Sequence, residues 1–215
     1  MTEPEQQMQP SARNPVLLVH GLDDTSVKLA RLEAYLQARG WSPHTIDLWP
    51  SDGSLGIEAL AEQVQSLVNS YFDPAQSLDL VGYSMGGIVS RYYLQRLGGL
   101  SRVQRLVTVA SPHYGTYTGY LRPNLGAQQM RWGSPFLANL NRDMAQLQKI
   151  RFTSIWTPLD LMIVPAESSC LPVGRQVQVL VPLHHWMVED PLALGAIAAA
   201  LEEPLATSYV SPTRL

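Results

Sequence analysis

Residues 78–94 read LDLVGYSMGGIVSRYYL. Residues 78–82 predict a strand and residues 85–97 predict a helix, so the turn between them carries the pattern G-x-S-x-G at residues 82–86. A turn this tight leaves no room for a Cβ at either glycine. It lifts the Ser84 hydroxyl clear of the strand, at a helix N-terminus where amide N–H groups favour a developing negative charge. Ser84 is therefore the candidate nucleophile, and a glycine-rich turn with an incidental serine is the alternative.

Short apolar runs alternate with longer segments of helical spacing on both sides of this stretch. The predicted strands are 16–19, 44–48, 78–82, 103–109, 152–156 and 176–181. The predicted helices are 27–39, 57–71, 85–97 and 192–201, with 136–147 as a further candidate. Such alternation is typical of parallel strands joined by covering helices, so we expect a mostly parallel sheet of about six strands with helices on both faces.

The length and the apolar content predict one domain. A chain of 215 residues with 46% hydrophobic residues can bury one substantial core and is short for two. We place the domain at residues 15–203, between a flexible N-terminal tail at 1–14 and a C-terminal tail at 204–215. Residues 112–147 interrupt the alternation, and their first part is rich in Gly, Pro, Tyr and Asn. An insertion of this kind predicts a lid or cap, and ordinary packing on the sheet is the alternative.

The composition argues against several classes of protein. With 15 Lys+Arg against 18 Asp+Glu and a formal net charge of -3, the chain lacks the clustered positive charge of a nucleic-acid-binding surface. Cys170 is the single cysteine, which excludes an intrachain disulfide and favours a cytoplasmic location. The polar N-terminal residues do not resemble a secretory signal, and no apolar run reaches the roughly 18 residues of a transmembrane segment.

A serine hydroxyl needs a histidine to take its proton and a carboxylate to orient that histidine. In proteins with this type of turn the order along the chain is Ser, acid, His. His184 and His185 follow the last predicted strand, and from the order alone both are candidates for the base; simple packing in a loop is the alternative. Asp160 follows the fifth predicted strand and is the favoured acid, with Glu167 as the runner-up.

Two backbone amides complete the predicted site. The loop after the first strand commonly supplies one half of an oxyanion hole, and the residue after the nucleophile supplies the other. The predicted donors are the N–H groups of Leu22 and Met85. The ring of His20 is expected to brace the first loop rather than to transfer protons. This chemistry needs neither a metal ion nor an organic cofactor, and none is predicted.

Three blocks carry a resemblance to a known family: VLLVHG at 16–21, GYSMGG at 82–87 and TVASPHYGT at 108–116. Together they resemble the lipase branch of the α/β-hydrolases, over most of the chain from Pro15 to Leu201. The third block is similar to triacylglycerol lipases and to the GPI-inositol deacylase group. The residues from 152 to 165 resemble the acid-bearing block of small bacterial lipases, which supports Asp160.

The resemblance also separates the two histidines. His184 lies six residues before the pair Asp190-Pro191, as the catalytic histidine does in a common family ending, so it implies His184 as the base and His185 as the second choice. It implies an α/β-hydrolase fold and a lipase or carboxylesterase that cleaves a small ester or lipid substrate. Transient contact with lipid surfaces fits that function. The alternatives are a non-catalytic binding module, or an amidase, thioesterase or lactonase with the same triad.

Overall fold

The computed structural model describes residues 13–205. Its sheet has six strands in the order β2-β1-β3-β4-β5-β6. They are β1 (Val16–Val19), β2 (Pro43–Ile46), β3 (Leu78–Tyr83), β4 (Val103–Val109), β5 (Arg151–Trp156) and β6 (Arg175–Gln178). Each strand pairs in parallel with its neighbours. The predicted parallel sheet of about six strands is therefore confirmed.

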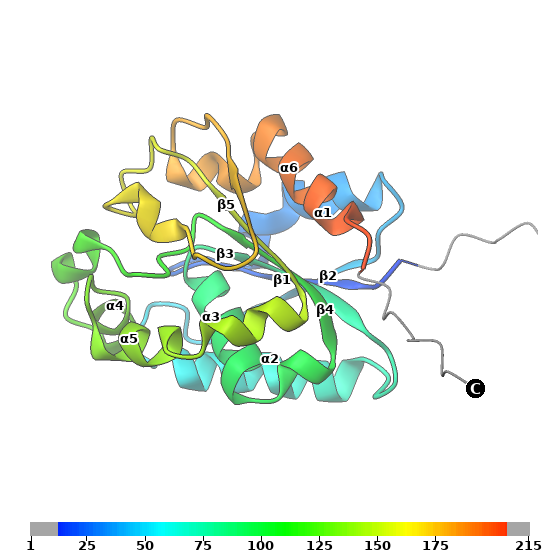
Figure 1. Ribbon diagram of the computed structural model, residues 1–215, viewed down its shortest axis with the longest axis horizontal. Helices are drawn as coiled ribbons and strands as arrows, with labels where there is room; N and C mark the ends of the chain where they lie inside the picture. Colours follow the sequence, from blue (N-terminus) through cyan, green and yellow to red (C-terminus); the bar gives the residue numbers. More distant parts are fainter. Residues whose placement is uncertain (1–12, 206–215) are drawn as a thin grey trace, which may run out of the picture.

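Helices cover both faces of the sheet (Figure 1). They are α1 (Ala30–Gln37), α2 (Ile57–Tyr71), α3 (Met85–Arg96), α4 (Leu125–Gln129), α5 (Pro135–Asn141) and α6 (Pro191–Glu202). Successive side chains of a strand point to opposite faces, so each strand contributes to two cores. Leu17 and Val19 belong to the core with α2 and α3, whereas Val16 and Leu18 belong to the core with α1 and α6. Because all six strands are parallel, their carboxyl ends meet at one edge of the sheet.

Several predicted elements differ in their bounds, and the strand predicted at 44–48 lies at Pro43–Ile46. The predicted helix at 27–39 begins with a 3-10 turn, Ser26–Leu29, before α1. The strand predicted at 176–181 ends at Gln178. The N–H of Val179 still donates to the carbonyl oxygen of Trp156 at 2.9 Å, and the carbonyl oxygen of Val181 accepts a 2.8 Å hydrogen bond from the side chain of Thr157.

The insertion at 112–147 contains more helix than its irregular composition predicts. Asn124 caps α4 by accepting a hydrogen bond from the N–H of Ala127, and Ser134 caps α5 in the same way, with a proline at the first helical position. The helix predicted at 136–147 is wrong beyond Asn141. Asp143 there turns its carboxylate toward α3, where Arg96 donates a 2.6 Å hydrogen bond to it.

Residues 1–12 and 206–215, which make up most of the predicted tails, lie outside the described residues, and the predicted domain limits stay a prediction. Within residues 13–205, each helix is too short or too polar to span a bilayer.

Candidate active site

Ser84 lies in the turn between β3 and α3, with a φ of 53°. A positive φ is uncommon for a residue with a Cβ and is typical of the strained turn that exposes a nucleophile. Its flanking glycines have no space for side chains. A Cβ on Gly82 would lie 2.6 Å from the carbonyl oxygen of Gly86, and a Cβ on Gly86 would lie 2.3 Å from the carbonyl oxygen of Val19. Both glycines are thus packing requirements of the turn.

We expect Gly86→Ala to lower the free energy of unfolding by at least about 3 kcal/mol, because the new methyl group overlaps β1 backbone that is fixed in the sheet. Gly195→Ala in α6 is the matched control. The nearest atom to its added Cβ is 3.8 Å away, and alanine favours a helix. Urea unfolding followed by tryptophan fluorescence measures both variants, and equal stability of the two would contradict this account of the turn.

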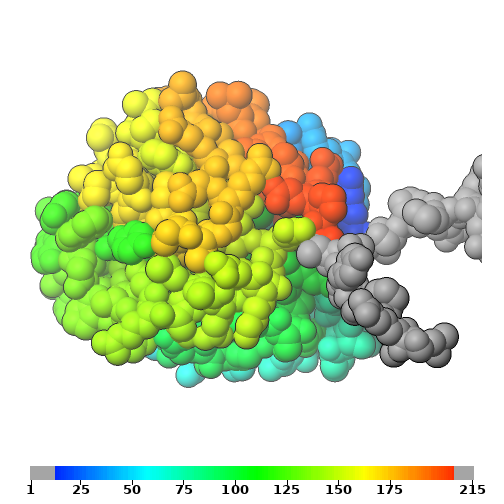
Figure 2. Space-filling model, viewed as in Figure 1, coloured from blue at the N-terminus to red at the C-terminus, as the bar shows by residue number. Residues whose placement is uncertain are grey.

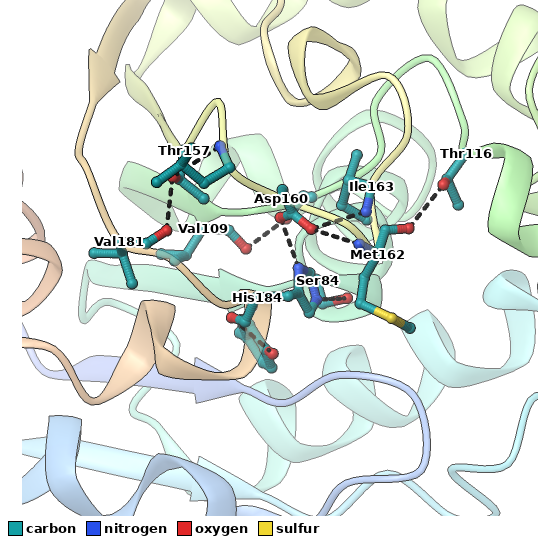
Figure 3. Close-up of polar contacts among 12 residues, drawn as sticks. Ser84, Val109, Thr116, Thr157, Asp160, Met162, Ile163, Val181 and His184 are labelled. Atoms are coloured by element: carbon teal, nitrogen blue, oxygen red, sulfur yellow. Dashed lines mark hydrogen bonds and ion pairs between the residues drawn. The ribbon is translucent and has the colours of Figure 1, made fainter.

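Ser84, His184 and Asp160 form one hydrogen-bonded chain (Figure 3). His184 Nε2 lies 3.0 Å from Ser84 Oγ, and His184 Nδ1 lies 2.7 Å from Asp160 Oδ2. A carboxylate only accepts, so Nδ1 carries the proton and Nε2 is free to accept the serine proton. The aspartate side chain is 1% exposed and that of the histidine 11% exposed, so water competes little for either bond. This arrangement can deprotonate Ser84.

The loop after β5 holds the acid in place. Asp160 Oδ1 accepts hydrogen bonds from the N–H groups of Met162 at 2.8 Å and Ile163 at 2.9 Å, which leaves Oδ2 for His184. Thr116 of the insertion holds the same loop. Its hydroxyl donates to the carbonyl oxygen of Met162 at 2.8 Å and accepts from the N–H of Val164 at 2.9 Å. The start of the insertion and the acid loop are therefore one connected unit (Figure 3).

The base is held from the strand side. The hydroxyl of Tyr83, the last residue of β3, donates a 3.3 Å hydrogen bond to the carbonyl oxygen of His184, and the two rings lie 5.2 Å apart. Burial, and after it the charge of Asp24, raise the pKa of this hydroxyl, so it stays protonated and able to donate. Tyr83 thus orients the loop that carries His184.

The competing site residues lie elsewhere. His185 is exposed at the pocket rim, with its ring 5.7 Å from that of Trp186, and the structure brings His184 rather than His185 to Ser84. Glu167 is exposed in the 3-10 turn Ala166–Ser169. Within residues 13–205, no cluster of three or more His, Cys, Asp or Glu side chains is arranged to hold a metal ion.

The two predicted amide donors flank Ser84. Met85 is the first residue of α3, where an N–H group has no partner inside the helix. Among the described residues, no hydrogen bond uses the N–H of Leu22, which lines the pocket. His20 Nδ1 donates to the carbonyl oxygen of Gly21 at 2.8 Å while its Nε2 accepts from the N–H of Leu48 at 2.9 Å. The ring therefore braces the loop that carries Leu22.

A pocket of about 720 Å³ opens around Ser84 and His184. Its apolar wall comes mainly from the insertion and the acid loop: Leu121, Ala127, Met130, Leu161, Met162 and Ile163. These two segments lie side by side on the molecular surface, in green and yellow at the left of Figure 2. The charged lining consists of Asp23, Asp24 and Lys28, which follow β1, and of Arg122 from the insertion. The pocket therefore combines an apolar wall with a charged lining.

The insertion is tied to the loop between β2 and α2. The N–H of Gly126 donates to the carbonyl oxygen of Gly53 at 2.8 Å. The side-chain amide of Asn124 donates to the backbone carbonyl oxygen of Asp52 at 2.7 Å. Arg122 forms an ion pair with Asp23 of the loop after β1. These contacts fix the insertion as a wall of the pocket.

Sequence reasoning missed Asp24, Lys28 and Thr116 as pocket residues. The first two follow the VLLVHG block by three and seven residues, and Thr116 ends the third block. Loops at the carboxyl edge of a parallel sheet converge on one site, so their position after a strand was the available signal.

Comparisons with known proteins match more than half of the chain to one family model. Residues 15–136 match the family model described as palmitoyl protein thioesterase. The chain is 32% identical over 120 residues to lysosomal thioesterase PPT2 of Bos taurus, covering 52% of this chain and 38% of the bovine protein. It is 33% identical over 116 residues to the human protein of the same name, covering 50% and 37%. The chain thus aligns with less than half the length of these relatives.

Solved structures show the same fold. Bacillus licheniformis lipase BlEst2 in its mature form has a TM-score of 0.73 at 16% identity, covering 91% of this chain and 94% of that one. Aspergillus fumigatus lipase B has a TM-score of 0.75 at 16% identity, covering 90% of this chain and 53% of that one. The predicted α/β-hydrolase fold is confirmed by this likeness.

Proposed function

Because this chain belongs to the palmitoyl protein thioesterase family, we propose that it is a serine hydrolase that cleaves fatty-acyl esters through an acyl-enzyme on Ser84. The observation that carries the proposal is the hydrogen-bonded chain from Ser84 through His184 to Asp160, beside an apolar pocket wall. Thioesters are the second candidate substrate class. The family model and the names of the relatives favour them.

In the proposed first step, His184 Nε2 takes the proton of Ser84 while Oγ attacks the ester carbonyl carbon. The carbonyl oxygen becomes an oxyanion, and the N–H groups of Leu22 and Met85 donate to it. One such donor typically contributes roughly 3 to 4 kcal/mol to lowering the barrier. Asp160 stabilises the imidazolium that forms.

The leaving group then departs and the acyl-enzyme remains. His184 gives its proton to a leaving alcohol, whereas a thiol, with an ordinary pKa of about 8.5, can leave as the thiolate and needs that proton less. His184 next deprotonates a water molecule that attacks the acyl-enzyme, and Ser84 recovers its proton as the fatty acid leaves. The same residues therefore serve ester and thioester hydrolysis.

The acyl chain is expected to lie along the apolar wall that the insertion and acid loop supply. Leu121 and Leu161 belong to that wall and are 82% and 76% exposed at its rim, which supports transient contact with a lipid surface. A cytoplasmic location stays our prediction, while the relatives' names describe them as lysosomal.

We expect kcat/KM to rise about two- to fourfold for each methylene added to the acyl chain of p-nitrophenyl esters from C2 upward, until the wall is filled, because a buried methylene contributes up to about 0.8 kcal/mol. Matched octanoyl oxygen esters and thioesters then decide the preferred bond. A flat profile from C2 to C12, or one limited to short chains, would contradict the acyl-binding wall.

Labelling with a fluorophosphonate probe tests the catalytic role separately. An activated serine reacts covalently with the probe, and peptide mass spectrometry is expected to find the adduct on Ser84. A folded protein that does not react would instead support the non-catalytic binding module.

A further inference from the structure

Asp24 places a carboxylate beside the nucleophile. A Cβ built on Gly21 would lie 3.0 Å from Asp24 Oδ2 and 3.2 Å from Ser84 Cβ, so these two atoms are within about 6 Å of each other. Asp24 is half-buried and lines the pocket. It has no hydrogen-bond or ion-pair partner in the part of the chain that the structure describes, and neither the 3-10 turn at Ser26–Leu29 nor its cap uses this side chain. The fold therefore gives Asp24 no structural task.

The other charged residues that line the pocket form ion pairs. Asp23 forms an ion pair with Arg122, and Lys28 forms one with Glu189. Among the charged residues that line the pocket, Asp24 is the carboxylate without an ion pair in the described part of the chain. The lining therefore carries one unbalanced negative charge. Burial raises the pKa of Asp24 above its ordinary value, and the nearby ammonium of Lys28 offsets only part of that rise. A positive charge on a bound substrate would therefore stabilise the ionised form of this carboxylate.

Asp24 lines the same pocket as Ser84 and His184 and belongs to neither of the two segments that supply the apolar wall. His184 must reach the leaving atom to protonate it, so the leaving group lies next to the imidazole. The charge of Asp24 acts on both His184 and Tyr83, whose rings lie 5.2 Å apart. The acyl chain has the apolar wall on the side of the insertion and acid loop.

We propose that Asp24 makes this enzyme selective for esters and thioesters whose alcohol or thiol part carries a positive charge. The proposal rests on the proposed function and names the leaving-group class for the same site. It also predicts poor cleavage of esters with anionic leaving groups, because a second negative charge would face the same carboxylate.

Octanoylcholine and 3,3-dimethylbutyl octanoate test the proposal, together with their thioester analogues. The two alcohols have nearly the same shape, and only choline is charged. We expect the wild-type chain to hydrolyse the choline ester with about fivefold higher kcat/KM, mainly through a lower KM, as for one partly exposed ion pair. In Asp24→Asn the ratio of kcat/KM for the choline ester to that for the neutral ester should fall to about one.

Glu62→Gln is the matched control. It removes one carboxylate from the exposed side of α2, changes the net charge equally and should keep the cation preference. Added salt at 0.5 M should weaken the preference of the wild type and leave Asp24→Asn unchanged. An unchanged ratio in Asp24→Asn, or an equal loss with both esters, overturns the proposed role of Asp24 and leaves the proposed function standing. Failure of the wild type to hydrolyse any of the esters overturns the proposed function instead.

Discussion

Ser84→Ala is expected to lower kcat for ester hydrolysis by a factor on the order of 10⁵ to 10⁶, because no other atom can form the acyl-enzyme. The methyl group fits where the hydroxyl was, so the pocket and the amides of Leu22 and Met85 persist. Substrate binding should therefore survive while turnover is lost. Hydrolysis of p-nitrophenyl octanoate under saturating conditions measures the effect.

Ser66→Ala is the control for this variant, since it removes an exposed hydroxyl of α2 that donates only to the carbonyl oxygen of Glu62. It should keep wild-type turnover. Near-wild-type activity of a pure, folded Ser84→Ala preparation, free of host esterases, would remove Ser84 from the mechanism. Loss of fluorophosphonate labelling in the same preparation provides a second measurement.

The fold was predictable where one local pattern determines the structure. The apolar runs at β1 and β4 and the helical spacing of α2 match the structure residue for residue, since burial on one or two faces sets their periods. The short helix α4 was missed, and the helix predicted at 136–147 ran past the end of α5, because five to seven residues are too few to show a period. Their caps, Asn124 and Ser134 followed by proline, were the readable signal.

Some residues of the candidate site could be predicted from the sequence, and others could not. Chain order and placement after a strand pointed to Asp160, and the structure joins it by hydrogen bonds through His184 to Ser84; their catalytic roles stay predictions. From order alone, His184 and His185 could not be separated, because neighbouring residues point in different directions and only the loop conformation determines which one faces the serine. Asp24 was missed since its importance comes from the ion pairs that the other charges form, which only the folded structure shows.

Asp160→Asn is expected to lower kcat by a factor of roughly 10⁴ with little change in stability. The carboxylate accepts the Nδ1–H of His184 through Oδ2 and two backbone N–H groups through Oδ1. In the variant, the amide oxygen can keep the two backbone bonds, which leaves the NH₂ group facing Nδ1. The imidazole must then carry its proton on Nε2, where it can no longer accept the proton of Ser84.

Glu167→Gln is the matched comparison for this variant, because it makes the same carboxylate-to-amide change at the competing acid, which is exposed in the turn after the acid loop. We expect turnover within about twofold of the wild type, as for a surface substitution away from the hydrogen-bonded chain. The two variants together assign the acid. A large loss in Glu167→Gln with full activity in Asp160→Asn would reverse the assignment and show that the 2.7 Å contact between Asp160 and His184 does not serve catalysis.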